Sequence, residues 1–276
     1  MLYEARKQVV YVVFVFSLLA YAVFVTLLLY RNNHQSQVVS VIRPPYIPSG
    51  LVELFDYITK TSRNCHNPLT VPGTEYREGE NRSISGHEGT FICLDGVPDT
   101  PEACRIYSFG FNRDDIKFET TMGKRGCRVH LVSGTTEYSY STVGKNVYLY
   151  PLNLSNSTGL GEYTLDNFIN LMNHMEEPIQ YIKTTTMGTE WTLLHNLFTS
   201  KYNAFHHVKQ IRLLLHLPLA NDDNIEILQQ QYRLLLGLEY YGYSLLYSRP
   251  INGTFYFHYN LDRDVATKYE TVWVRH

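Results

Sequence analysis

The spacing of apolar and polar positions changes repeatedly along residues 91–276. Short apolar runs of strand length alternate with stretches in which apolar residues recur every three or four positions, as on one face of a helix. Repeated strand–helix units favour a parallel sheet covered by helices on both faces. The pattern therefore predicts an α/β fold, a doubly wound, mostly parallel sheet forming one domain over 91–276.

Individual elements follow from the same runs. The predicted strands are 105–108, 127–132, 147–152, 179–184, 208–217, 243–247, 255–259 and 270–274. The predicted helices are 51–61, 114–124, 164–172, 190–198 and 221–240. Thr164 is the expected N-cap of its helix, because a threonine hydroxyl accepts a hydrogen bond from a free backbone N–H. Gly126 is the expected stop of the helix before it.

The start of the chain has a different pattern, since residues 9–30 carry no charge. As a helix this run is roughly 33 Å long, enough for a hydrocarbon core of about 30 Å. Arg6 and Lys7 precede it, so residues 1–8 are expected to stay in the cytosol. The sequence predicts a type II single-pass protein with a signal-anchor. The alternative is a cleaved signal peptide, because residues 20–22 have the A-x-A form.

This topology predicts that the rest of the chain lies in the secretory pathway, in the Golgi, the ER or at the cell surface. Residues 31–90, rich in Pro, Gly, Asn and Ser, are expected to form a stalk and an irregular lead-in. Sequons of the form N-x-[ST] predict glycosylation at Asn81, Asn153, Asn156 and Asn252.

An even number of cysteines suits disulfides in an oxidising compartment; the four are Cys65, Cys93, Cys104 and Cys127. Three pairings are possible, and Cys93–Cys104 is favoured because these residues flank a short loop. Free buried thiols are the alternative. No C-x-x-C or clustered Cys/His spacing occurs, so no metal site is predicted.

Composition narrows the class of protein. The chain has 24 Lys+Arg and 26 Asp+Glu, a net charge of −2, which argues against a nucleic-acid partner. Hydrophobic residues make up 44% of the chain, which excludes a disordered protein.

Ligands of doubly wound sheets bind beyond the carboxyl ends of the strands. The turn at 108–112 is expected at this edge, and Gly110 would let the backbone approach a ligand closely. The turn matches neither G-x-G-x-x-G nor a P-loop, so NAD and nucleoside triphosphates are poor candidates.

Several segments, in order, resemble one known family. They are 104–110 (CRIYSFG), 118–119, 126–130 (GCRVH), 164–165, 181–183, 188–191 (GTEW), 210–216 and 269–273. The chain resembles the membrane-anchored, FkbM-like methyltransferase-domain family, the methyltransferase-like protein 24 group. The resemblance implies a seven-stranded S-adenosylmethionine-binding fold with an antiparallel last strand. It implies cofactor-binding positions at Ser108, Phe109, Gly110, Ser133 and Thr185.

The chain departs from the family pattern at four expected carboxylates, which are replaced by Ser133, Thr185, Met187 and Leu214. The acid expected at Ser133 would bind the two ribose hydroxyls, and a neutral serine is a poorer partner. The first functional hypothesis is therefore a degenerate methyltransferase-like domain, a pseudoenzyme or binding module. The alternative is an active S-adenosylmethionine-dependent methyltransferase of the secretory pathway that acts on glycan or protein.

Methyl transfer often needs a base, and Glu190 and His216 are the candidate catalytic residues. Each also has a structural interpretation, since Glu190 begins a predicted helix, where its charge is favourable, and His216 ends a predicted strand. For the other polar or aromatic candidates the sequence favours structural or solvent-facing positions; they are Asp114, Asp115, Glu119, His130, Trp191, His195, His206 and His207.

Overall fold

The computed structural model describes residues 51–72, 89–110, 116–134, 140–185, 188–201, 204–218, 225–258 and 263–276. All of them belong to one compact unit, residues 46–276.

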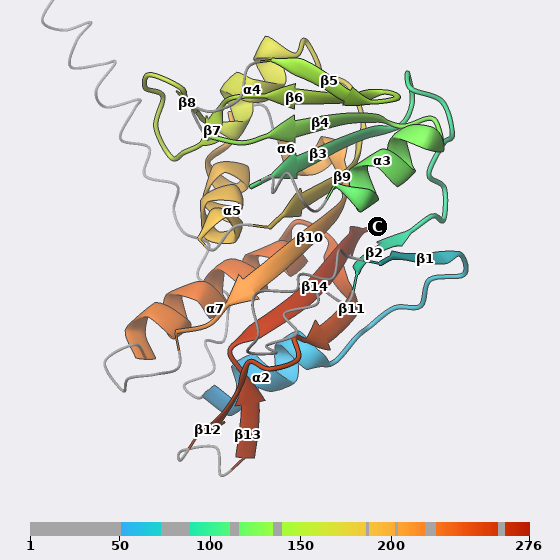
Figure 1. Cartoon of the computed structure of the whole chain (residues 1–276). Coiled ribbons are helices and arrows are strands. Elements are labelled where there is room, and N and C mark those ends of the chain that lie inside the picture. Colours follow the sequence, from blue (N-terminus) through green and yellow to red (C-terminus); the bar gives the residue numbers. More distant parts are fainter. Residues whose placement is uncertain are drawn as a thin grey trace, which may run out of the picture. The chain divides into compact units, whose positions relative to one another are not determined.

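An eight-stranded mixed sheet forms the centre of this unit, in the order β11-β14-β10-β9-β3-β4-β6-β5 (Figure 1). Its strands are β3 (Arg105–Phe109), β4 (Arg128–Val132), β5 (Ser141–Gly144), β6 (Val147–Tyr150), β9 (Ile179–Thr184), β10 (Val208–His216), β11 (Tyr243–Pro250) and β14 (Lys268–Arg275). Strands β6, β4, β3, β9 and β10 are parallel neighbours. The last strand, β14, runs antiparallel between β10 and β11, and β5 forms an antiparallel hairpin with β6.

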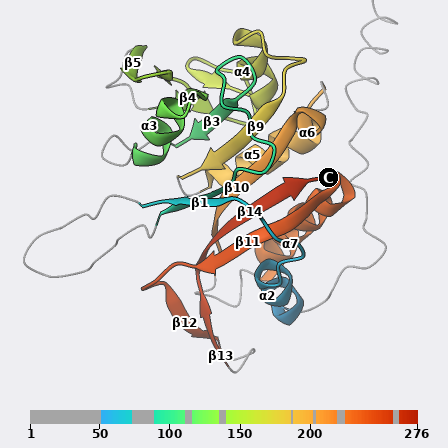
Figure 2. The ribbon, with the colours of Figure 1, turned by 90° about the vertical axis from the view of Figure 1, so that its right-hand side faces the viewer.

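Helices cover one face of the sheet more fully than the other (Figure 2). The helices on the first face are α2 (Leu51–Thr59), α4 (Leu165–Leu171), α5 (Thr189–Thr199), α6 (Ala204–His207) and α7 (Ile225–Tyr240). The second face is covered by α3 (Lys117–Lys124) and by the hairpin of β1 (Pro68–Val71) and β2 (Thr90–Cys93). Within the described residues, three smaller strand pairs lie outside the main sheet. Besides β1 with β2, they are β7 (Asn153–Leu154) with β8 (Glu162–Tyr163) and β12 (Phe255–His258) with β13 (Arg263–Ala266).

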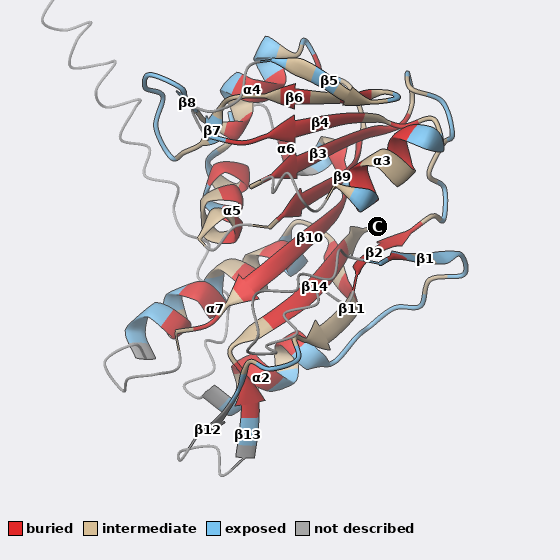
Figure 3. Ribbon diagram, in the orientation of Figure 1, coloured by how far each residue is buried: buried red, intermediate tan, exposed pale blue. Residues whose placement is uncertain are grey.

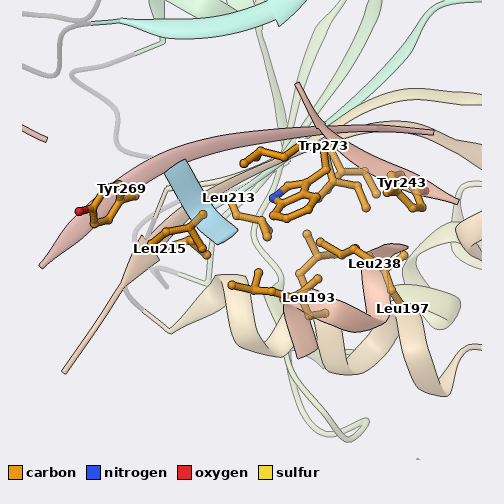
Figure 4. Close-up of a cluster of buried hydrophobic side chains, with 14 of the residues drawn as sticks. Leu193, Leu197, Leu213, Leu215, Leu238, Tyr243, Tyr269 and Trp273 are labelled. Carbon is orange, nitrogen blue, oxygen red and sulfur yellow. The ribbon is translucent and has the colours of Figure 1, made fainter. Parts of the chain in front are cut away.

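The main core lies between the sheet and the first group of helices (Figure 3). Leu213 and Leu215 alternate along β10 with side chains that face the other way, so β10 contributes every second residue to this core. Trp273 is fully buried beside them, and Leu193, Leu197 and Leu238 of α5 and α7 face it (Figure 4).

Two predicted helix ends are confirmed. The Thr164 hydroxyl accepts a hydrogen bond from the Asn167 backbone N–H at 3.3 Å, which caps α4. Gly126 follows α3 with φ +107°, and a Cβ there would lie 1.9 Å from the carbonyl oxygen of Asp99. Only glycine fits this turn without a backbone shift.

The β1–β2 hairpin is attached to the second face through side chains. The Gln210 amide accepts from the Cys93 N–H at 3.1 Å and donates to the Cys93 carbonyl at 2.6 Å. Glu270 accepts from the Phe91 N–H at 3.3 Å, and the Tyr181 hydroxyl donates to the Phe91 carbonyl. Side chains thus supply β2 with the bonds that a neighbouring strand would give it.

Both disulfides lie at this side of the fold, and they pair Cys65 with Cys93 and Cys104 with Cys127. The favoured pair Cys93–Cys104 was wrong. Cys104 and Cys127 precede the adjacent parallel strands β3 and β4, and the Arg128 N–H donates to the Cys104 carbonyl at 2.8 Å. Strand pairing, rather than loop length, brings these two sulfurs together.

The fold prediction needs three corrections. The sheet has eight strands instead of seven, because β5 extends its edge. Residues 62–90 were predicted to be irregular, yet they contain β1 and the first residue of β2. The predicted transmembrane helix over 9–30 falls outside the described residues; among those described, no helix is long and apolar enough to cross a membrane. The single-pass, secretory-pathway localisation that depended on that helix is withdrawn.

The predicted glycosylation residues stay predictions. Asn153, Asn156 and Asn252 are exposed, and Asn81 lies outside the described residues.

Candidate functional site

Three of the predicted cofactor-binding residues lie together at the carboxyl edge of the sheet. Gly110, Ser133 and Thr185 directly follow β3, β4 and β9, which are neighbours in the sheet. The Gly110 N–H donates to the Val132 carbonyl at 3.1 Å, and the Thr185 N–H donates to the Phe109 carbonyl at 3.1 Å. The parallel ladder therefore continues one residue beyond the strands and fixes the three residues side by side.

The side chain of Thr185 occupies the turn after β3. Its hydroxyl oxygen lies 2.9 Å from the carbonyl oxygen of Phe109 and 2.6 Å from that of Gly110. Gly110 has φ +81°, a conformation that glycine adopts without strain. The backbone acceptors of this turn are thus paired within the protein.

The side chains of Ser108 and Phe109 do not face this edge, and the cofactor-binding role of these two residues stays a prediction. The Ser108 hydroxyl donates to Glu119 Oε1 at 2.7 Å beneath α3. Phe109 is buried in the main core.

The two candidate catalytic residues are brought into direct contact. Glu190 lies in the first turn of α5, and His216 is the last residue of β10. Glu190 Oε1 accepts from the His216 backbone N–H at 3.0 Å and lies 3.1 Å from His216 Nδ1. The Glu190 side chain is fully buried, whereas 13% of the His216 side chain is exposed. The pair has the form of a carboxylate that orients an imidazole at the carboxyl edge of the sheet.

The remaining sequence candidates are dispersed. Glu119 and His130 are buried, His195 and His206 are exposed, and Trp191, His207 and His216 are half-buried. Leu214 is buried in β10. Asp114, Asp115 and Met187 lie outside the described residues.

Two groups of buried polar contacts were not predicted from the sequence. Lys183 pairs with Glu119 beneath α3, and both side chains are almost wholly buried. On the opposite face, Tyr107 bonds His174, and Tyr150 bonds His130. Lys183 is the one charged residue of the predicted strand 179–184, but nothing in the sequence indicated Glu119 as its partner.

The described residues contain one group of three side chains close enough together for a cation, Cys65, Cys93 and Asp95. Its two sulfurs are bonded to each other, so they cannot act as thiolate ligands.

The residues at the edge do not fit S-adenosylmethionine well. A ribose diol presents two donors, and a carboxylate accepts both with charge-assisted bonds. The described residues directly after β3, β4 and β9 carry no carboxylate, and Ser133 stands at the end of β4. The carbonyl oxygens of Phe109 and Gly110 are already bonded to Thr185.

Comparison with known proteins gives one distant relative. No family model matches the chain. Over 187 residues the chain is 24% identical to probable methyltransferase-like protein 24 of Homo sapiens. The aligned region covers 59% of this chain and 48% of that protein. The chain thus spans about half the length of the curated relative it matches. The match supports the resemblance to the methyltransferase-like protein 24 group.

Proposed function

We propose that the sheet domain is a methyltransferase-like pseudoenzyme, a binding module that has lost useful affinity for S-adenosylmethionine. The observation that carries this proposal is the contact of the Thr185 hydroxyl with both carbonyl oxygens of the turn at Phe109 and Gly110. It supports the proposal because a threonine stands where the family has an acid, and its hydroxyl is bonded to the protein itself.

Ser133 supports the same conclusion. Replacing a carboxylate by a neutral hydroxyl removes charge-assisted bonds to the ribose, at a cost of roughly 2–3 kcal/mol. That loss corresponds to about 30- to 150-fold in affinity, since about 1.4 kcal/mol is tenfold.

A matched pair of variants tests the proposal. Ser133→Asp restores the carboxylate, and Ser133→Asn has a similar size without the charge. We expect Ser133→Asp to raise the affinity for S-adenosylmethionine by about 30- to 150-fold over Ser133→Asn in calorimetry. Equal cofactor affinities of the two variants would count against a lost ribose contact.

The second candidate function is an active S-adenosylmethionine-dependent methyltransferase with a rearranged site, acting on glycan or protein. The contact between Glu190 and His216 favours it, because a carboxylate-oriented imidazole is a common general base. Turnover by the unmodified chain with S-adenosylmethionine would select this function over the first.

A further inference from the structure

The contact between Glu190 and His216 leaves one polar atom of each side chain unused. Glu190 Oε2 is buried and has no hydrogen-bond partner among the described residues. His216 uses its backbone N–H and Nδ1 on Glu190, and within the same described residues Nε2 makes no hydrogen bond. Of the two, only Glu190 Oε2 is a buried unpaired atom, which is unusual in native proteins. His216 Nε2 belongs to a side chain that is 13% exposed.

The geometry sets the tautomer of the imidazole. A carboxylate accepts hydrogen bonds, so the ring proton of a neutral His216 belongs on Nδ1, facing Glu190 Oε1 at 3.1 Å. Nε2 then carries a lone pair and acts as a hydrogen-bond acceptor. The His216 side chain is 13% exposed, so it is accessible in part from outside the protein.

We propose that His216 and Glu190 form a binding site for a hydroxyl-bearing ligand, whose O–H donates to His216 Nε2. Glu190 is the positioning residue that holds the imidazole with Nδ1 inward. The inference rests on the proposed function, because it names the ligand chemistry that the binding module would recognise.

Charge favours a hydroxyl over an anion at this site. The pair carries one negative charge when His216 is neutral, and the described residues place no lysine or arginine in hydrogen-bond contact with either side chain. An anionic ligand would be repelled by Glu190. A divalent cation would lack ligands, because no third ligating side chain of the described residues joins the pair.

Nitrogen NMR of the full chain labelled with ¹⁵N-histidine tests the proposal. We expect the His216 signals to report a protonated Nδ1 and an unprotonated Nε2. Methyl glucoside, a compact molecule with several hydroxyls, should shift the Nε2 signal. Its fully O-methylated counterpart has the same ring and no O–H donor, so it should leave the signal unchanged.

Variants assign the effect to the pair. Glu190→Gln preserves the size of the side chain and removes its charge, so the Nδ1–H preference and the response to methyl glucoside should both weaken. Glu226→Gln, on the exposed start of α7, is the control and should leave both unchanged. The tautomer and the response to the two glucosides are measured on the unmodified chain, so the test does not depend on whether a variant folds.

A His216 protonated on Nε2, or an equal response to the two glucosides, would overturn the proposal. A titration with S-adenosylmethionine in the same sample separates this result from the proposed function. Cofactor binding with a hydroxyl-specific shift would contradict the pseudoenzyme and leave the hydroxyl site standing. If S-adenosylmethionine does not bind and methyl glucoside causes no shift, the pseudoenzyme stands and the hydroxyl site is contradicted.

Discussion

The hydroxyl oxygen of Tyr107 lies 2.6 Å from Nδ1 of His174, although 67 positions separate the two residues. The His174 ring meets that of His130, with centroids 5.2 Å apart, and His130 Nδ1 lies 3.2 Å from the Tyr150 hydroxyl. His130 Nε2 is buried without a partner in the described part of the chain. Two imidazoles thus share an aromatic site that stabilises their neutral forms.

Stability is predicted to fall in mild acid because of these histidines. Burial, with help from the neighbouring His174 and two arginines, lowers the pKa of His130 to about 3. Burial and the nearby Arg105 and Arg128 lower the pKa of His174 to about 4. A folded pKa below the unfolded value of about 6.5 means that the unfolded chain takes up the proton first. The stabilisation is therefore complete above about pH 6.5 and is lost as the pH falls.

At pH 5 the stability lost through His130, relative to pH 7 and above, is about 2 kcal/mol, from about 1.4 kcal/mol per pH unit below 6.5. His174 adds in the same direction. Urea unfolding of the full chain between pH 8 and pH 5 measures the effect. His130→Gln should make this pH dependence shallower by about one proton, and an unchanged slope would contradict the buried neutral imidazole.

The buried ion pair of Lys183 and Glu119 gives a second prediction. Their side chains are 3% and 2% exposed, and the Ser108 hydroxyl also donates to the carboxylate. Lys183→Met should cost about 3–5 kcal/mol of unfolding free energy, because it leaves Glu119 buried without its counter-charge. The double variant Lys183→Met, Glu119→Leu should recover part of the loss.

Lys124→Met is the matched control, since Lys124 is exposed at the end of α3, the helix that carries Glu119. Its effect should stay within about 0.5 kcal/mol. If Lys183→Met and Lys124→Met unfold at the same urea concentration, the buried pair contributes nothing.

Non-reducing peptide mapping should find the disulfides Cys65–Cys93 and Cys104–Cys127. The bridges close loops of 28 and 23 positions, and in the chain-entropy model each contributes about 3.5 kcal/mol. Replacing both cysteines of one bridge by serine should lower the unfolding free energy by about that amount. A Cys93–Cys104 peptide would show that the pairing is wrong.

Local pattern was enough to predict elements whose own residues are buried. The strand 179–184 was predicted with the bounds of β9, because all six residues of β9 are buried. The Thr164 cap was equally local. Strand β1 was not predicted, since it has four residues and two of them are exposed. Its partner β2 is held by side chains from distant strands.

Contacts between distant segments could not be predicted from the pattern of apolar and polar residues. Glu190 and His216 were each identified as candidates, but their 3.1 Å contact depends on β9 and β10 being neighbours in the sheet. The same holds for Cys104 and Cys127, whose pairing follows from the register of β3 with β4. Ser108 was predicted to bind the cofactor from its place at the end of a predicted strand. The sequence pattern did not show that its side chain is directed at Glu119.

Calorimetric titration of the unmodified full chain with S-adenosylmethionine and S-adenosylhomocysteine tests the central claim most directly. We predict no measurable heat of binding for either molecule at tens of micromolar, because Ser133 and Thr185 replace the expected acids and Thr185 is bonded to the turn at Gly110. Binding of either molecule at low micromolar concentration would contradict the pseudoenzyme and favour the active methyltransferase.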